Sequence, residues 1–206
     1  LMGHLLCDGG LRIVYQDDHL LVVEKPAGLP SVPGRTLEKR DSLQTRAQRR
    51  FPDARAVHRL DVDTSGLLLV ALDKATRRGL SRAFARREVK KRYVALLEQG
   101  PHGLEVLIEL SSGPDDIALP RQRLRSDGRL GRTRWRVLEG PRVEFSPLDG
   151  RTHQMRLAAR HGLGVPIVGD ALYGCVGERL MLHAEALSLR HPVTGDHLEL
   201  RSPPPF

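Results

Sequence analysis

The chain has 206 residues, of which 40% are hydrophobic and 28% are charged, and both values are ordinary for a globular domain with a sizeable core. It has no apolar run long enough to cross a bilayer and no signal-peptide pattern at its start, which argues against a membrane or secreted protein. Its two cysteines, Cys7 and Cys175, are too few for a disulfide framework or a structural zinc set, so we expect a cytoplasmic protein.

The basic residues are strongly biased toward arginine. The net charge is +8, and 28 of the 33 basic residues are arginine. Guanidinium groups match phosphate oxygens and stack on bases, so this bias favours a nucleic-acid partner. A GC-rich genome that favours arginine codons would give the same composition. The charge alone therefore leaves both explanations open.

The first ten residues carry no pattern, and we expect a loose leader over residues 1–10. The rest of the chain alternates short apolar runs with turn residues. The predicted strands cover residues 11–15, 20–24, 67–72, 91–97, 143–145, 187–190 and 197–200. The predicted helices cover residues 42–50, 74–87 and 153–161, with N-caps at Asp41 or Ser42, at Asp73 and at Thr152.

Strands outnumber helices, and several of them follow one another through short turns. This order predicts an α+β fold with a mixed, mainly antiparallel central sheet and flanking helices and loops. No internal repeat and no linker composition divides the chain, so residues 11–206 are expected to form a single domain. Nothing in the sequence suggests an obligate dimer, and we expect a monomer.

Arginines alternate with other residues through the segment 121–137. Arg121, Arg123 and Arg125 precede a possible turn at residues 126–129, and Arg132, Arg134 and Arg136 follow it. A hairpin here would carry six arginines on one face and Leu124, Trp135 and Val137 on the other. The ordinary explanation is a solvated outer face. We favour a phosphate-binding surface, because six like charges repel one another without counter-ions.

The stretch 58–69 predicts a short strand, a polar loop and a buried strand, with the Asp61 carboxylate presented at the loop. Gly66 allows the backbone to turn sharply before the buried strand. Taken alone, an aspartate before a turn is usually a turn-capping residue. Taken alone, Tyr93 would more often be a core residue of a strand, and Arg156 an exposed helix residue.

Three blocks in order give these residues a shared context. They read HRLDVDTSG at His58–Gly66, GRTHQMR at Gly150–Arg156 and GDALYG at Gly169–Gly174. With these blocks the chain resembles, from about Ile13 to Pro204, the RluA family of RNA pseudouridine synthases. The stretch LVVEKPAGLPSVPGR at Leu21–Arg35, and the absence of an extra S4-type RNA-binding domain, are similar to the dual tRNA and rRNA type within this family.

The resemblance implies an isomerase that needs no cofactor and no metal. In this reaction the uracil leaves its ribose, rotates, and rejoins through a ring carbon. The resemblance implies that Asp61 is the catalytic carboxylate, that Arg156 keeps it ionised, and that Tyr93 stacks on the uracil and helps to remove a proton. Arg59, beside Asp61, is the candidate that fills the gap left by the flipped base.

The expected partner is RNA, in a tRNA anticodon stem-loop, a large-subunit rRNA hairpin, or both, and no membrane. Thr64 is expected to shape the Asp61 loop and to contact the substrate. Further RNA contacts are expected from the arginines of the alternating segment, namely Arg121, Arg123, Arg125, Arg132 and Arg134.

Two alternatives remain open at this point. One is an RNA-binding or ribosome-assembly factor without catalysis, which would keep the basic faces but would not need Asp61, Tyr93 and Arg156 together. The other is an aspartic peptidase, suggested by the sequence DTSG at residues 63–66. A peptidase needs two carboxylates that share a proton, and its usual triplet has no inserted serine, so the sequence disfavours it.

Overall fold

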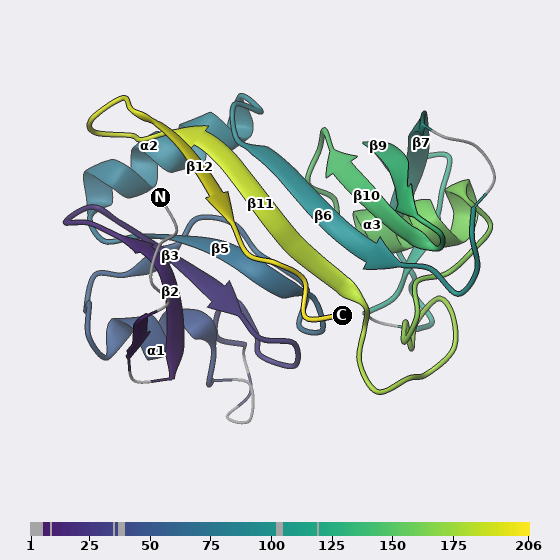
Figure 1. Ribbon diagram of the computed structural model, residues 1–206, viewed down its shortest axis with the longest axis horizontal. Helices are drawn as coiled ribbons and strands as arrows, with labels where there is room; N and C mark the ends of the chain where they lie inside the picture. The colour runs from purple at the N-terminus through teal and green to yellow at the C-terminus, as the bar shows by residue number, and fades with distance from the viewer. Residues whose placement is uncertain (1–5, 9, 35, 37–39, 102–104, 119) are drawn as a thin grey trace. The chain divides into compact units, whose positions relative to one another are not determined.

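The computed structural model describes residues 6–8, 10–34, 36, 40–101, 105–118 and 120–206 (Figure 1). The chain divides into two compact units. Unit 1 comprises Leu1–Lys91 and Ala184–Pro205, and unit 2 comprises Arg92–His183 with Phe206. Whether both units act as the single domain expected over residues 11–206 stays a prediction.

Unit 1 is built, over its described residues, on seven strands. They are β1 (Leu6–Asp8), β2 (Leu11–Gln16), β3 (Leu20–Lys25), β4 (Arg55–Ala56), β5 (Ser65–Ala71), β11 (Leu182–Arg190) and β12 (His197–Arg201). Their order is β1-β2-β3-β5-β11, with β4 beside β5 and β12 beside β11. The pairs β1–β2, β2–β3, β3–β5, β4–β5 and β11–β12 are antiparallel. β1 falls inside the segment expected to be loose, and it pairs with β2 instead.

The core of unit 1 explains why β3 and β5 have continuous apolar sequences. Leu20–Val23 in β3 and Leu67–Ala71 in β5 are fully buried, and the two strands pair antiparallel with Val22 opposite Leu69. A strand that is buried on both faces needs no polar alternation. This pair places the start of β5, at Ser65, directly after the polar loop predicted to carry Asp61.

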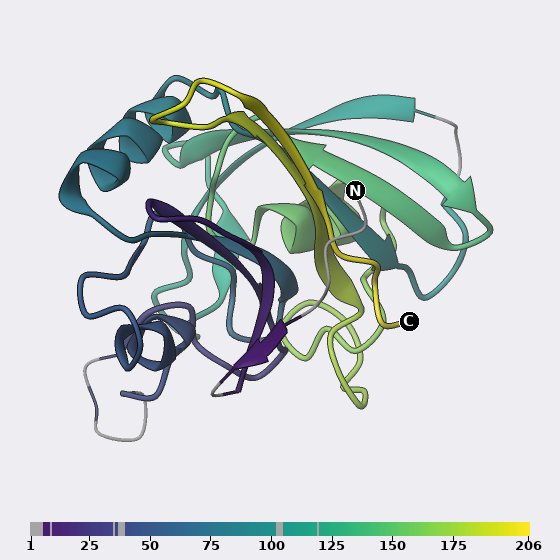
Figure 2. The same cartoon turned by 60° about the vertical axis from the view of Figure 1, so that its left-hand side comes forward.

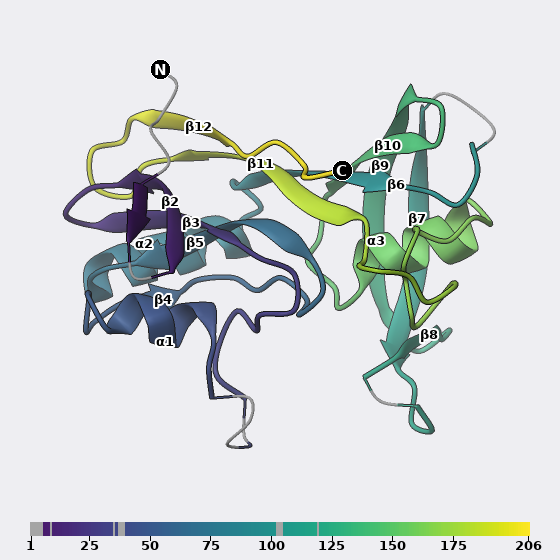
Figure 3. The same cartoon turned by 60° about the horizontal axis from the view of Figure 1, so that its bottom comes forward.

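Two helices complete unit 1, and both begin at predicted caps. Helix α1 covers Leu43–Gln48, and Ser42 caps it in a reciprocal arrangement with Thr45. Helix α2 covers Lys74–Ala85, and the Asp73 carboxylate accepts from the Thr76 N–H at 2.8 Å. α1 contacts β2 and β4, whereas α2 contacts β5 (Figure 3). Both helices end about two residues earlier than predicted.

Unit 2 is also built on antiparallel strands. They are β6 (Lys90–Leu96), β7 (Glu105–Pro114), β8 (Gln122–Leu124), β9 (Arg129–Glu139) and β10 (Arg142–Pro147), in the order β6-β10-β9-β7-β8. The prediction of an α+β fold with a mainly antiparallel sheet is therefore confirmed. No helix among the described residues is long and apolar enough to cross a membrane.

The hairpin predicted over residues 121–137 does not form. β8 and β9 do not pair with each other, because β7 lies between them and pairs with both. Ser112 of β7 is opposite Leu124 on one side and Arg129 on the other. The predicted alternation along β9 is correct, since Thr133 and Trp135 are buried. The prediction was wrong about pairing: β8 and β9 each pair with β7 and not with each other.

The helix predicted at residues 153–161 is shorter and starts differently. Helix α3 covers Gln154–Leu157 and continues as a π-helical turn over Ala158–Gly162. The N-cap position is His153, which has a φ of 55° and makes no side-chain cap bond, so the predicted cap at Thr152 is wrong. α3 packs against β9 and β10, and the π-helical turn against β7 (Figure 2).

Candidate active site

A short loop between β4 and β5 carries Asp61. The Asp61 carbonyl accepts a hydrogen bond from the Thr64 N–H at 3.2 Å, which closes a turn. Asp61 is half-buried, while Val62 at the tip of the turn is 46% exposed. Gly66 then enters β5 with a φ of +116°, and a Cβ at this position would collide with the backbone of Ala184. Glycine is therefore required where the loop joins the buried strand.

A fully buried lysine holds this turn through backbone atoms. Lys25 Nζ donates to the carbonyls of Pro26, Leu29 and Val62 at 2.8, 2.7 and 2.8 Å. Three carbonyl acceptors thus match the three donors of an ammonium group. The Gly28 N–H also donates to the Val62 carbonyl, at 2.9 Å. The loop after β3 is therefore attached to the tip of the turn that follows Asp61.

Two hydroxyl side chains lie close to Asp61. Ser31 contacts the residue before it, and Thr64 follows it in the same loop. Ser31 Oγ donates to the Leu60 carbonyl at 2.8 Å and accepts from the Leu60 N–H at 2.9 Å, so it fixes the residue before Asp61. Thr64 is 2% exposed, and its Oγ1 has no hydrogen-bond partner among the described residues. An unsatisfied buried hydroxyl is costly, so Thr64 has bonding capacity that the surrounding protein does not use.

His58, the first residue of the HRLDVDTSG block, has a structural role. Its Nε2 accepts a hydrogen bond from the Leu69 N–H of β5 at 3.0 Å, and its ring stacks on Phe84 of α2 at 4.9 Å. Burial, together with the positive charge of Lys91, lowers the pKa of His58 to about 3. The imidazole is therefore neutral at physiological pH and able to accept this bond.

Tyr93 and Arg156 belong to unit 2, whereas Asp61 belongs to unit 1. Tyr93 lies in β6, opposite Phe145 of β10, and is 5% exposed. The β6–β10 pairing therefore fixes the backbone of Tyr93 within its unit. The convergence of Tyr93 and Arg156 on Asp61 stays a prediction.

Arg156 forms a buried ion pair with Asp170. Its Nε donates to Oδ2 at 2.9 Å and its Nη2 donates to Oδ1 at 2.5 Å, and both side chains are almost fully buried. The Asp170 carboxylate also accepts from the N–H groups of Leu172 and Tyr173, at 3.0 and 3.1 Å. This bidentate contact fixes the plane of the guanidinium group. It also explains why an aspartate stands in the block at residues 169–174.

Tyr173 connects the second and third sequence blocks. The Arg156 guanidinium lies 5.2 Å from the centre of its ring, and its hydroxyl lies 2.7 Å from Nδ1 of His153. The same hydroxyl accepts from the Gln122 N–H at 2.8 Å, which attaches the start of β8. Arg121 lies over the ring as well, at 5.6 Å. The two blocks therefore build one buried polar cluster around Arg156.

Comparisons with known proteins agree with this arrangement. The family model for RNA pseudouridylate synthases matches residues 19–161. A protein named dual-specificity RNA pseudouridine synthase RluA from Escherichia coli is 43% identical over 207 residues, covering 95% of this chain and 94% of the relative. Its namesake from Yersinia pestis is 40% identical over 200 residues, covering 92% and 97%. The chain belongs to the RNA pseudouridylate synthase family.

Solved structures extend the comparison to the fold. Human RNA pseudouridylate synthase domain containing 1 has a TM-score of 0.80 at 32% identity, covering 96% of this chain and 85% of that one. Human RNA pseudouridylate synthase domain containing 4 has a TM-score of 0.73 at 26% identity, covering 94% and 88%. The protein is an RluA-type RNA pseudouridine synthase, an isomerase that converts uridine in RNA to pseudouridine. Neither an inactive RNA-binding factor nor an aspartic peptidase finds support in these matches.

Most arginines of the alternating segment of this synthase are paired with carboxylates. The pairs lie between 2.8 and 3.3 Å and join Arg123 to Asp116, Arg125 to Asp116 and Asp127, Arg132 to Asp149, and Arg136 to Glu144. The argument from six arginines without counter-ions is therefore wrong. Within the described part of the chain, the exposed Arg134 has no carboxylate at ion-pair distance.

Sequence reasoning missed Lys25 and the roles of Asp170 and Tyr173. Lys25 is the last residue of β3 and precedes Pro-Ala-Gly. A lysine that ends a buried apolar strand is the signal that could have identified it. The sequence placed Asp170 and Tyr173 in the third block but indicated no role for either residue. Among the described residues, no group of three or more His, Cys, Asp or Glu side chains is placed to hold a metal ion.

Proposed function

We propose that Asp61 acts on the ribose carbon of a uridine that is flipped out of an RNA hairpin, with Tyr93 against its uracil and Arg156 as the cation beside the Asp61 carboxylate. One observation carries this proposal. Lys25, Gly28 and Ser31 all bind backbone atoms of Leu60 and Val62, so the turn is held on both sides of Asp61 without a contribution from its carboxylate to these bonds.

Isomerisation of uridine begins at the ribose carbon, where a carboxylate in a fixed position is needed. The glycosidic bond breaks, the uracil rotates, and a new bond forms between the ribose carbon and a ring carbon, which loses its proton. Asp61 serves the first step, either by bonding to the ribose carbon or by stabilising its positive charge. Tyr93 supplies an aromatic face and a hydroxyl for the last step.

The remaining site residues are proposed to bind the RNA. Arg59 is exposed next to His58, where a guanidinium can stack in the gap left by the flipped base. Arg121, Arg123, Arg125, Arg132 and Arg134 are proposed to contact phosphates. The exposed ion pairs of Arg123 and Arg125 do not prevent this, because such pairs contribute only about 0–1 kcal/mol and phosphate oxygens can replace the carboxylate. The Arg132 pair is different, because its partner Asp149 is buried.

A substitution at Thr64 tests the proposed role of its hydroxyl, because valine has nearly the same size and shape as threonine. We expect Thr64→Val to lower the rate of pseudouridine formation about tenfold to a hundredfold, because the bound substrate would lose a hydrogen bond to the Thr64 hydroxyl. The same change should leave the melting temperature unchanged or raise it, since it removes an unsatisfied buried hydroxyl. Single-turnover assays and thermal unfolding of both proteins measure the two effects. A strongly destabilised variant would show that the hydroxyl is part of the folded loop instead.

The proposed targets are a tRNA anticodon stem-loop and a large-subunit rRNA hairpin, modified by a monomer in the cytoplasm. The support is the resemblance of residues 21–35 to the dual type, together with the dual-specificity name of the relatives. Incubating the purified protein with a transcript of each RNA, followed by nucleoside analysis, should give pseudouridine in both. Product in one RNA only would narrow the target to that class. RNA binding without product in either would contradict the proposal.

A further inference from the structure

Helix α2 carries a basic outer face that no part of the site described above uses. Its inner side buries Thr76 and Leu80. On the opposite side, cationic side chains are exposed at almost every turn: Lys74, Arg77, Arg78, Arg82 and Arg86. The small residues Ser81 and Ala85 lie between them, so long side chains of other types do not cover this surface. We refer to these five cations as the α2 basic face.

The α2 basic face differs from the arginines of β8 and β9 in its counter-ions. Over the described ranges of the chain, no carboxylate lies at ion-pair distance from any of its five cations. The nearest acid in the sequence, Asp73, instead caps the helix and lies 3.0 Å from the ring of His19. A surface that combines high positive charge with missing counter-ions raises the local concentration of polyanions.

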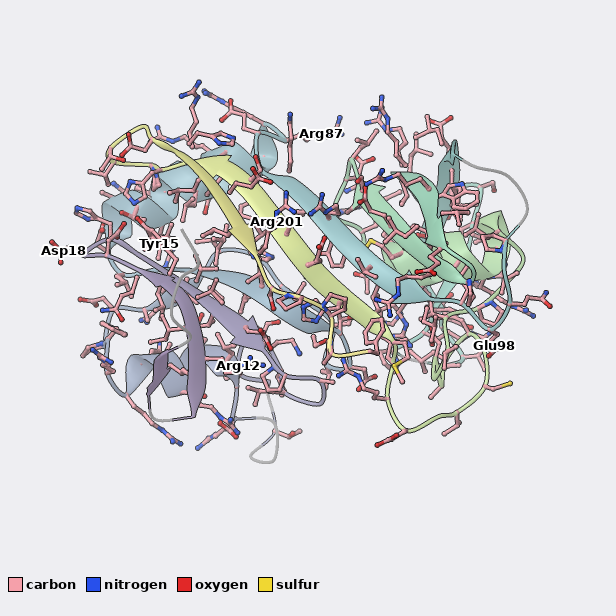
Figure 4. All side chains as sticks on the ribbon, in the orientation of Figure 1. Arg12, Tyr15, Asp18, Arg87, Glu98 and Arg201 are labelled. Atoms are coloured by element: carbon pink, nitrogen blue, oxygen red, sulfur yellow. The ribbon has the colours of Figure 1, made fainter. Side chains whose placement is uncertain are left out.

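Helix stability does not account for this pattern. Lys74, Arg78, Arg82 and Arg86 stand four residues apart, and each like-charged pair at this spacing destabilises a helix by about 0.2–0.5 kcal/mol. Apart from the cap Asp73, the first turn of α2 has no acidic residue, and Lys74 puts a positive charge at its first position, where the helix dipole disfavours one. Arg87, labelled in Figure 4, follows α2. Its φ is 60°, a backbone conformation in which glycine is favoured. These residues lower the stability of α2 and concentrate positive charge on its outer side.

The inner side of α2 contacts the first residue of the HRLDVDTSG block directly. Phe84 stacks on His58 with an interplanar angle of 30°, and His58 stands three residues before Asp61. His58 in turn is bonded to Leu69 in β5. A ligand on the outer side of α2 would therefore be held by an element whose inner side packs against the start of the loop that carries Asp61.

We infer that the α2 basic face binds the phosphate backbone of a base-paired stem in the RNA that this protein binds. The row of four cations from Lys74 to Arg86 is about 18 Å long at 1.5 Å per residue, which suits a strand of phosphates better than a single small anion. Guanidinium forks bind phosphate oxygens in pairs, and such contacts fix position without reading the bases. The inference takes from the proposed function only that the ligand is a structured RNA.

The test compares two double variants that each remove two positive charges from exposed positions. Arg78→Gln with Arg82→Gln interrupts the row on α2, and glutamine keeps the helix propensity. Arg49→Gln with Arg190→Gln is the control, because both arginines are exposed and lie outside α2. The dissociation constant for an anticodon stem-loop transcript is measured at several salt concentrations, and the single-turnover rate is measured at saturating RNA.

We expect the α2 variant to bind about tenfold more weakly near 0.1 M salt, with a salt-dependence slope that is smaller by about 1.5. The control should stay within about twofold of the native protein, and the rate at saturation should not change in either variant. Equal weakening in both variants, or none in the α2 variant, would overturn the inference. Weakened binding by the α2 variant, with no product even from the native protein, would contradict the proposed function and leave this inference standing.

Discussion

Replacing Asp61 with asparagine should lower the rate of pseudouridine formation by at least about 10⁴-fold while the protein still folds and binds RNA. The amide keeps the size of the side chain but can neither bond to the ribose carbon as a carboxylate does nor stabilise its positive charge. The fold should tolerate the change, because the turn is held through the backbone by Lys25, Ser31 and the Thr64 N–H.

The matched control is Asp63→Asn, which removes the same charge from an exposed position two residues further along the same loop. Single-turnover release of tritium from uridine labelled at the reacting ring carbon measures both variants. The control should retain activity within a few fold of the native rate. Comparable losses in both variants would mean that loop charge, rather than one carboxylate, drives the reaction.

Replacing Asp170 with asparagine should have the largest effect on stability, a loss of about 3–5 kcal/mol. The change leaves the Arg156 guanidinium buried next to a neutral amide, in place of its bidentate carboxylate. It also weakens the acceptor for the N–H groups of Leu172 and Tyr173. At about 2–4 °C per kcal/mol for a chain of this size, the melting temperature should fall by roughly 10 °C.

Asp116→Asn serves as the comparison, because it removes a carboxylate from exposed pairs with Arg123 and Arg125. Exposed pairs are worth about 0–1 kcal/mol, so its melting temperature should change by no more than a few degrees. Thermal unfolding followed by circular dichroism gives both values. A small effect of Asp170→Asn would show that the buried pair is replaceable and that Arg156 is oriented by other contacts.

The sequence predicted what local pattern and spacing determine. The aliphatic run after Gly66 forms the predicted buried strand, and Ser42 and Asp73 cap their helices as their positions indicate. The Asp61 loop was selected as the candidate site because three blocks in order carry much more information than Asp61 alone.

The errors concern contacts between residues that lie far apart in the chain. Period-two alternation shows which face a strand buries, but it does not identify the neighbouring strand, and β7 therefore replaced the expected partner of both β8 and β9. The counter-ion of Arg132 is 17 residues away, at Asp149. The sequence alone therefore could not show which of these arginines are paired with a carboxylate.

Buried charges were missed for the same reason. Lys25 is stabilised in part by the carbonyl of Val62, 37 residues later, and Arg156 by Asp170, 14 residues later. Read in isolation, each of these charged residues would be assigned to the surface. His153 shows a local limit as well, because its left-handed backbone conformation displaces the helix start that Thr152 was expected to cap.

The measurement that tests the account most directly is a crystal structure of the protein bound to a uridine-containing stem-loop. The account predicts one flipped uridine with its ribose carbon beside the Asp61 carboxylate, its base against the Tyr93 ring, and the Arg156 guanidinium next to the carboxylate. A bound RNA whose target uridine lies away from Asp61, or a pocket that lacks either Tyr93 or Arg156, would contradict it.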